Sequence, residues 1–148
     1  MTYKSLIHLT LIAVAFTSAP ASAGQVTTIT CGPLSGIKVE LVDGRANTVP
    51  ETQVGPIFFI DSENPQQLVS LWKTKLFDKE TTEKFEAEIV ESNNVKVHAI
   101  ECDNSGLHSY TIFLKDGTLF YSFHRLKSPF DKGSTLLSYV GKCEVKAN

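Results

Sequence analysis

The sequence predicts a mainly antiparallel β domain of the α+β class: a meander of four or five strands that can curl toward a barrel, with one helix beside it. Two observations predict the strands. Short runs alternate apolar with polar residues, and turn signals such as Asp43-Gly44, Asn104-Ser105 and Asp116-Gly117 separate these runs. A third observation predicts the helix, because the apolar residues after Asn64-Pro65 change to helical spacing.

Residues 1–23 have the features of a secretory signal peptide. Lys4 is their one charge, an apolar run follows from Leu6 to Phe16, and Ala21-Ser22-Ala23 forms a small-residue cleavage site. The apolar run is about half of the ~20 residues that a membrane span needs, which disfavours a membrane anchor. We therefore expect a periplasmic or secreted protein whose single β-rich domain covers residues 24–148, without a membrane span.

The charge of the chain argues against nucleic acid as a partner. The formal net charge is −2 at pH 7, and it becomes −3 without Lys4. After the predicted signal peptide the arginines are Arg45 and Arg125, and no basic cluster occurs. A nucleic-acid-binding face needs a positive footprint. We expect instead a small molecule or a protein of the cell envelope.

The first part of the domain is predicted to be extended chain. Residues 26–42 are rich in β-branched residues or alternate apolar with charged ones, and Asp43-Gly44 supplies a turn after them. Residues 46–56 have the composition of a loop. Residues 57–61, IFFID, predict a short apolar strand.

The one predicted helix covers residues 65–77. Asn64 can cap its N-terminus and Pro65 suits the first helical position. Its apolar stripe would consist of Leu68, Leu71, Trp72 and Leu76. The next segment, KFEAEIVE at residues 84–91, is compatible with a strand or a helix, and its alternation favours the strand.

Residues 95–126 predict two successive hairpins. If each turn has two residues, Ala99 opposes Tyr110 in the first hairpin and Tyr110 opposes Phe123 in the second. Both hairpins then place their apolar side chains on one face, which supports this register because a slip of one residue would scramble it. This face would carry Val95, Val97, Ala99, Tyr110, Ile112, Leu114, Leu119, Tyr121 and Phe123. A last strand is expected over residues 134–145.

A candidate binding site lies at the end of the second hairpin. The same register puts Glu101 opposite His108 and His108 opposite Arg125, at the rim of the aromatic face. Such a row can bind an anionic group through Arg125, with Glu101 setting the protonation state of His108. The alternative is a rim salt bridge worth less than ~1 kcal/mol. The predicted ligand-binding residues are Glu101, His108, Arg125, Tyr110, Tyr121 and Phe123.

No catalytic or metal-binding motif is recognisable. Ser109 and His124 would oppose each other on the other face, but the chain has no Gly-x-Ser-x-Gly motif and no nearby carboxylate on that face. The combination of His98, Cys102 and His124 matches no zinc-ligand spacing. We therefore predict no catalytic residue, no metal and no cofactor.

The three cysteines, Cys31, Cys102 and Cys143, predict one disulfide if the protein is exported. An antiparallel last strand would bring Cys143 near Gly117, at the opposite end of the sheet from Cys102. Because a disulfide needs Cα atoms within ~7 Å, we prefer the pair Cys31–Cys143. Cys102 is then expected to be a small buried residue, with a reactive thiol as the alternative.

Several of these features resemble small, uncharacterised secreted or periplasmic proteins of bacteria. The resemblance rests on the signal peptide, the early cysteine in TITCG, the hairpin that ends in FHR, and the final YVGKC; it implies export and little chemistry. A looser similarity is to periplasmic inhibitors of lysozyme, small β-barrels that also tie a late cysteine to an earlier one. This chain lacks their stretch of aromatic, serine and lysine residues in recognisable form, and the nearest segment is Ser128–Leu137.

The favoured function is a non-enzymatic exported binding protein, for a small amphipathic ligand or a protein partner in the cell envelope. Many aromatic residues on a curved sheet and the lack of a catalytic constellation motivate this hypothesis. Two alternatives remain: an envelope hydrolase that uses Glu101 and His108, and a secreted inhibitor that acts through the loop at residues 124–133.

Overall fold

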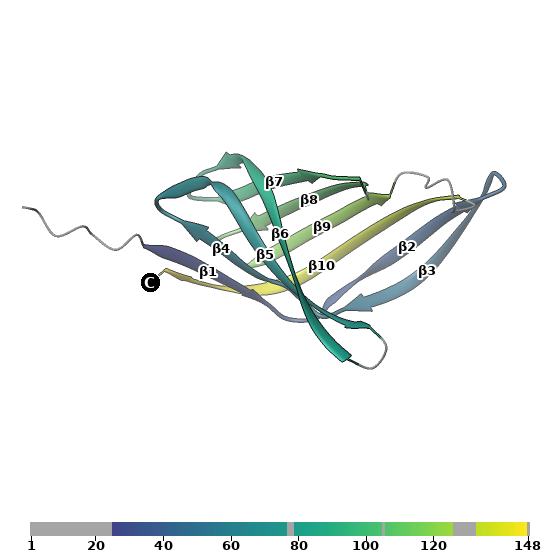
Figure 1. The fold of residues 1–148 in the computed structure, drawn as a ribbon, viewed down its shortest axis with the longest axis horizontal. Coiled ribbons are helices and arrows are strands. Elements are labelled where there is room, and N and C mark those ends of the chain that lie inside the picture. The colour runs from purple at the N-terminus through teal and green to yellow at the C-terminus, as the bar shows by residue number, and fades with distance from the viewer. Residues whose placement is uncertain (1–24, 77–78, 105, 126–132, 148) are drawn as a thin grey trace, which may run out of the picture.

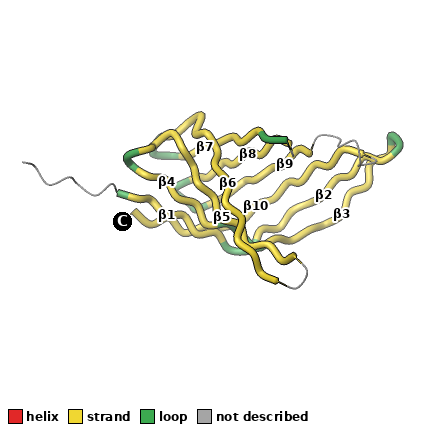
Figure 2. Tube along the Cα trace, viewed as in Figure 1, coloured by secondary structure: helices red, strands yellow, loops and turns green. Residues whose placement is uncertain are grey.

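The structure, a computed structural model, describes residues 25–76, 79–104, 106–125 and 133–147. The regular secondary structure in these residues is entirely β-strand (Figures 1 and 2). The strands are β1 (Val26–Cys31), β2 (Leu34–Val42), β3 (Arg45–Gln53), β4 (Ile57–Asp61), β5 (Asn64–Leu76), β6 (Lys79–Ser92), β7 (Lys96–Cys102), β8 (Gly106–Phe113), β9 (Thr118–Arg125) and β10 (Gly133–Ala147). No helix in this part of the chain is long and apolar enough to cross a membrane.

Eight of the strands form a closed antiparallel barrel. They follow one another in the order β1-β4-β5-β6-β7-β8-β9-β10, and β10 pairs back with β1. β2 and β3 form a hairpin outside this ring, which extends the sheet from β10 and projects to the right in Figure 1. The predicted α+β meander of four or five strands with one helix is therefore wrong.

The length of β10 explains how one sheet both closes and branches. Residues 133–140 of β10 pair with β2, and residues 143–147 pair with β1. β1 and β2 are separated by Gly32 and Pro33, and proline has no N–H to donate to a ladder. Beyond this interruption β1 has β4 as its other neighbour, whereas β2 has β3. β1, before Gly32, therefore belongs to the closed barrel, whereas β2, after Pro33, belongs to the hairpin outside it.

The predicted helix over residues 65–77 is wrong, because this segment lies in β5; residue 77 itself is outside the described residues. Residues 67–76 pair one for one with β6. Leu68, Ser70 and Trp72 are 0, 2 and 4% exposed, as expected of alternate residues on the inner side of a strand. A separation of four residues, as between Leu68 and Trp72, fits one helical turn and also two strand repeats. The long ladder with β6 decides for the strand.

Two neighbouring predictions have opposite outcomes. Residues 46–56, expected to be a loop, lie largely in β3, which pairs with β2 around the predicted turn at Asp43-Gly44. Both turn residues have positive φ angles, 50° and 74°, which this tight turn requires. Residues 84–91 lie in β6, so the favoured strand is confirmed.

The two predicted hairpins are present, but only the first has the predicted register. Ala99 opposes Tyr110 in β7–β8, as expected. In β8–β9 Tyr110 opposes Tyr121 instead of Phe123. The β8–β9 loop consists of residues 114–117, and its Gly117 has a φ of 64°. A shift of two residues keeps each side chain on its predicted face but changes its cross-strand neighbours.

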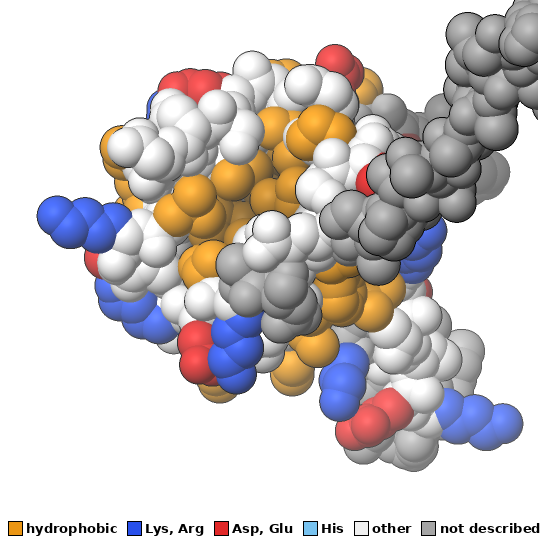
Figure 3. Space-filling view, turned by 90° about the vertical axis from the view of Figure 1, so that its left-hand side faces the viewer, with side chains coloured by type: hydrophobic (Ala, Val, Ile, Leu, Met, Phe, Trp, Pro, Cys, Tyr) orange, Lys and Arg blue, Asp and Glu red, His pale blue; other side chains and the backbone are white. Residues whose placement is uncertain are grey.

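Apolar side chains fill the closed part of the barrel. The largest fully buried apolar side chains include Ile29, Leu34, Phe58, Leu68, Tyr110, Ile112 and Leu119. Figure 3 looks onto the end of the barrel that lies at the left of Figure 1, where apolar side chains occupy the centre of the view and polar ones surround them. Ile60, Leu114 and Val145 are half-buried and pack against the core. Val95, which was expected on the apolar face, is 54% exposed.

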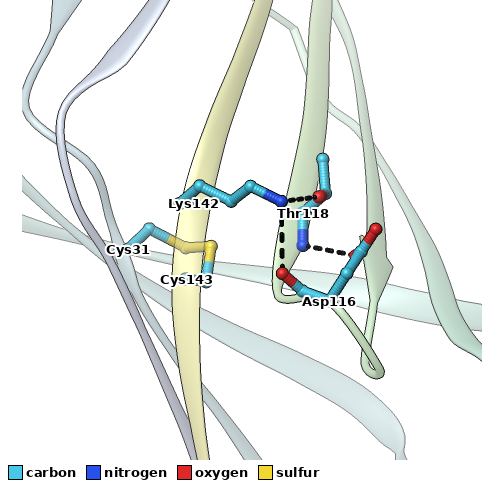
Figure 4. The surroundings of a disulfide bond; sticks show 5 residues. All are labelled: Cys31, Asp116, Thr118, Lys142 and Cys143. Carbon is cyan, nitrogen blue, oxygen red and sulfur yellow. Dashed lines mark hydrogen bonds between the residues drawn. A yellow bond between two sulfur atoms is a disulfide. The ribbon is translucent and has the colours of Figure 1, made fainter.

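The predicted disulfide between Cys31 and Cys143 is present and joins β1 to β10. Next to it, the Lys142 ammonium donates to the backbone oxygen of Asp116 (3.2 Å) and to Oγ1 of Thr118 (2.7 Å), which ties the β8–β9 turn to β10 (Figure 4). Cys102 is free but exposed, so the expectation that it is buried is wrong. It is the last residue of β7, where the strand leaves the core.

Candidate ligand-binding site

The barrel is closed over one half of its length and open over the other. β4 pairs with β5 only as far as Leu71, and β7 pairs with β6 only from Glu88 onward. Residues 72–76 of β5 and 79–87 of β6 therefore extend past the closed ring, and the β2–β3 hairpin extends past it as well (Figure 1). We call the sheet surface that continues from the barrel interior onto these hairpins the inner face.

The ladders define which side chains lie side by side on the inner face, because opposed residues of antiparallel strands share a face. One row crosses the sheet from β7 to β2. Its members are Glu101, His108, Phe123, Leu137 and Lys38. In the next row Tyr121 stacks between Tyr110 and Tyr139, with ring centres 5.1 and 6.0 Å apart. The inner face thus has an aromatic centre between charged side chains.

A small cavity of about 100 Å³ lies where the β5–β6 hairpin meets this aromatic centre; we call it the aromatic cavity. Its lining comes from five strands and consists of Gln53, Trp72, Thr74, Glu83, Phe85, His108, Tyr110 and Tyr121. The Trp72 and Tyr121 rings are 5.0 Å apart, and the Phe85 and His108 rings are 6.1 Å apart. The indole N–H of Trp72 donates to Oγ of Ser70 (3.2 Å), which fixes the ring against the wall.

His108 is the most unusual group in this cavity. Its side chain is 8% exposed, and Nδ1 lies 3.0 Å from the hydroxyl of Tyr121. Nε2 is buried and has no hydrogen-bond partner among the described residues. Burial lowers the pKa of His108 below its ordinary value, and the charge of Asp103 opposes this shift more weakly. The imidazole is therefore neutral at pH 7, with one nitrogen free to accept or donate a hydrogen bond.

The hydroxyl groups of two of the tyrosines donate hydrogen bonds to carboxylates. The Tyr139 hydroxyl donates to Oε2 of Glu51 (2.7 Å), and the Tyr110 hydroxyl donates to Oε2 of Glu101 (3.4 Å). Burial raises the pKa of Glu101, and the charge of Asp103 raises it further. Burial also raises the pKa of Tyr110 and Tyr139, so both phenols stay protonated and act as donors at neutral pH.

A second, larger hollow of about 350 Å³ lies next to the aromatic cavity; we call it the charged groove. It is lined by Lys38, Glu40, Val42, Glu51, Phe123, Arg125, Gly133, Ser134, Thr135 and Leu137. Lys38 and Glu40 form an ion pair at 2.6 Å. Phe123 in the groove stacks on His108 in the cavity, with ring centres 4.2 Å apart. This stacked pair therefore lies between the two hollows.

The six residues predicted for ligand binding all lie on the inner face, although not in the predicted arrangement. Glu101 opposes His108 as expected. Arg125 opposes Gly106 and not His108, because the longer β8–β9 loop moves β9 by two residues. Glu101 and His108 each hydrogen-bond a tyrosine and make no hydrogen bond with each other. Whether the six residues bind a ligand remains a prediction.

Sequence reasoning misses the part of the site that comes from distant strands. Trp72 and Phe85 lie on one side of the β5–β6 hairpin, and Glu51 and Lys38 lie on β3 and β2. Alternation in residues 68–72 and 83–89 could have placed Trp72 and Phe85 on the inner side of two strands. No local pattern shows that this side faces β8 and β9.

Comparison with known proteins adds no relative: no family model, no curated protein and no solved structure matches this chain. In the part of the chain that the structure describes, no three histidine, cysteine, aspartate or glutamate side chains gather in a way that could hold a metal ion.

Proposed function

We propose that this chain is a non-enzymatic exported binding protein that takes a small amphipathic ligand on its inner face. One observation carries the proposal: His108 lines an aromatic cavity, and its Nε2 atom is buried without a partner among the described residues. A buried polar atom that lacks a hydrogen bond costs about 1–3 kcal/mol, so such atoms are rare in folded proteins. A ligand with one polar group would remove this cost.

The surroundings of His108 have the composition of a ligand pocket. Such sites are mainly apolar and aromatic, with a few polar groups that orient the ligand. Here Trp72, Phe85 and Tyr121 supply aromatic surface, and the imidazole of His108 supplies a polar group. A β-barrel with one filled end and one open end is compatible with this role. The adjacent charged groove offers space for the rest of the ligand.

Export is the second part of the proposal. The disulfide between Cys31 and Cys143 is consistent with an oxidising compartment outside the cytosol. Residues 1–23, whose sequence predicts the signal peptide, lie outside the described residues. Periplasmic or secreted localisation is therefore proposed from the sequence and the disulfide together.

The geometry favours binding over the hydrolase. A hydrolase would use Glu101 and His108 as an acid–base pair, but each of these side chains hydrogen-bonds a tyrosine, and the two make no hydrogen bond with each other. An inhibitor would present the loop at residues 124–133 to an envelope protein. Residues 126–132 of that loop lie outside the described residues.

The first test is to compare the native mass of the exported protein with its denatured mass. A binding protein should carry extra mass that is lost on denaturation. Trp72, the one tryptophan of the chain, lines the cavity, so its fluorescence should change when the same compound is added back. The proposal would be refuted by two results together: a native mass equal to that of the chain alone, and no change of Trp72 fluorescence when the dialysable fraction of cell extract or medium is added to the protein.

A pair of histidine variants locates the binding site. His108→Phe keeps a ring in the cavity but removes the polar atom, and it should weaken binding of the returned compound about tenfold. His124→Phe changes an exposed histidine on the next strand and should leave binding unchanged. Equal affinities of both variants and the unmodified protein would place the ligand elsewhere.

A further inference from the structure

We propose that the ligand is a protonated organic amine whose ammonium group enters the aromatic cavity and donates an N–H to Nε2 of His108. This inference rests on the proposed binding function and names the chemical class of the ligand. It is carried by three properties of the cavity: the sign of the nearby charges, the faces of the aromatic rings, and the free imidazole nitrogen.

The charges around the aromatic cavity are negative. Glu83 lines it, and the lining residues include no lysine or arginine. Glu101 and Glu51 hydrogen-bond the tyrosines of the aromatic centre. The positive side chains Lys38 and Arg125 lie in the charged groove, where Lys38 is paired with Glu40. In a partly desolvated pocket this distribution favours a cation and disfavours an anion.

The aromatic rings attract the same kind of ligand. Trp72, Phe85, Tyr110 and Tyr121 all contribute to the wall of the cavity. The face of an aromatic ring carries partial negative charge, so it attracts a cation within ~6 Å. Clusters of such rings are a recurrent way to bind substituted ammonium groups. The ring cluster and the carboxylates therefore favour the same ligand charge.

His108 adds a hydrogen-bond acceptor for the ammonium group. When the Tyr121 hydroxyl oxygen accepts the proton of Nδ1, Nε2 carries a lone pair that lacks a partner among the described residues. A protonated primary or secondary amine has N–H bonds to donate to this atom. A quaternary ammonium group has none, so the cavity should prefer an amine that retains its N–H bonds.

The sizes of the two hollows divide the ligand into a head and a body. Sites for whole small molecules occupy ~300–1,000 Å³. The aromatic cavity, at about 100 Å³, suits a head group, whereas the charged groove, at about 350 Å³, can take a larger apolar part against Phe123 and Leu137. An aryl-alkylamine has this division.

Four matched probes test the inference through Trp72 fluorescence. We would titrate the full chain, freed of any retained ligand, with 2-phenylethylamine, 2-phenylethanol, 3-phenylpropanoate and N,N,N-trimethyl-2-phenylethylammonium. The amine should bind about tenfold more tightly than the alcohol and the carboxylate, because only it combines a positive charge with N–H bonds. The trimethylated cation should bind more weakly than the amine.

Two glutamates on β6 provide the matched variants. Glu83→Gln removes the exposed carboxylate that lines the cavity and should weaken amine binding about threefold. Glu86→Gln removes an exposed carboxylate that pairs with Lys84 and should leave amine binding unchanged. Circular dichroism checks that both variants are folded.

The possible failures are distinguishable. Tighter binding of the carboxylate, the alcohol or the trimethylated cation would overturn the amine assignment while the binding function stands. The absence of any response to the four probes would also overturn the assignment, and the mass comparison of the exported protein would then decide on the binding function separately.

Discussion

His108 lies among the rings of Phe85, Tyr110, Tyr121 and Phe123, with ring centres 4.2 to 6.4 Å away. Its hydrogen bond with Tyr121 satisfies one ring nitrogen and leaves the other without a described partner. Burial away from water disfavours a charged imidazole, which is the cause of its lowered pKa. The same residue therefore links the stability of the domain to pH and, in the proposed function, the cavity to its ligand.

We expect His108 to make the domain less stable in mild acid. Its pKa is lower in the folded state than the value of 6.5 that applies to the unfolded chain, so the unfolded state binds more protons below about pH 6.5. The free energy of unfolding should fall as the pH decreases below that value. Urea unfolding between about pH 7.5 and 5.5 should show a smaller fall for His108→Phe than for the unmodified protein.

The comparison uses slopes against pH, so a constant loss of stability in His108→Phe does not affect it. His124→Phe, which changes an exposed histidine on β9, is the control and should keep the slope of the unmodified protein. If His108→Phe also keeps that slope, another group causes the acid sensitivity.

At the scale of elements, β5 shows how a long partner strand overrides a local helical pattern. Asn64-Pro65 and the spacing of Leu68, Leu71 and Trp72 satisfy the usual helix rules. In the structure, residues 67–76 of β5 pair with β6. The other edge of β5 pairs with residues 57–61 of β4. Each ladder provides hydrogen-bond partners for the backbone N–H and C=O groups and buries alternate side chains at the same time. Tertiary context of this kind regularly outweighs propensity.

Two leucine variants separate the strand from the helix by experiment. Leu68 is fully buried, so Leu68→Ala should cost about 2–5 kcal/mol of unfolding free energy. Leu71 is on the opposite side of β5 and half-buried, so Leu71→Ala should cost about 1 kcal/mol. A helix would place both leucines on one stripe and give similar losses. Urea unfolding of the two variants distinguishes these outcomes.

At the scale of the whole molecule, the pairing of β1 with β10 closes the barrel. These strands come from the two ends of the described chain, and the disulfide joins Cys31 to Cys143 across a separation of 112 residues. β10 also pairs with β2 and, along its other edge, with β9. One strand thus connects the closed barrel, the projecting hairpin and the aromatic centre of the inner face.

Removal of the disulfide should destabilise the whole domain. For a loop of ~100 residues the chain-entropy model assigns about 4–5 kcal/mol to the crosslink. The double variant Cys31→Ala/Cys143→Ala should lose stability of this order in urea unfolding, whereas Cys102→Ser, at an exposed free thiol, should not. Thiol labelling of the native protein should modify Cys102 alone. Unchanged stability of the double variant would mean that the β1–β10 ladder closes the barrel without the crosslink.

Local patterns in the chain were sufficient for the β7–β8 register, the side of each residue in β8 and β9, the Cys31–Cys143 pair and the six predicted site residues on one face. Alternation and turn residues act over a few positions, so sequence alone can reveal them. The identity of β5 depends on its long ladder with β6, which outweighs the local helical pattern. Barrel closure and the placement of Trp72 beside Tyr121 and of Phe85 beside His108 depend on segments far apart in the chain. For that reason the aromatic cavity became visible only in the folded molecule.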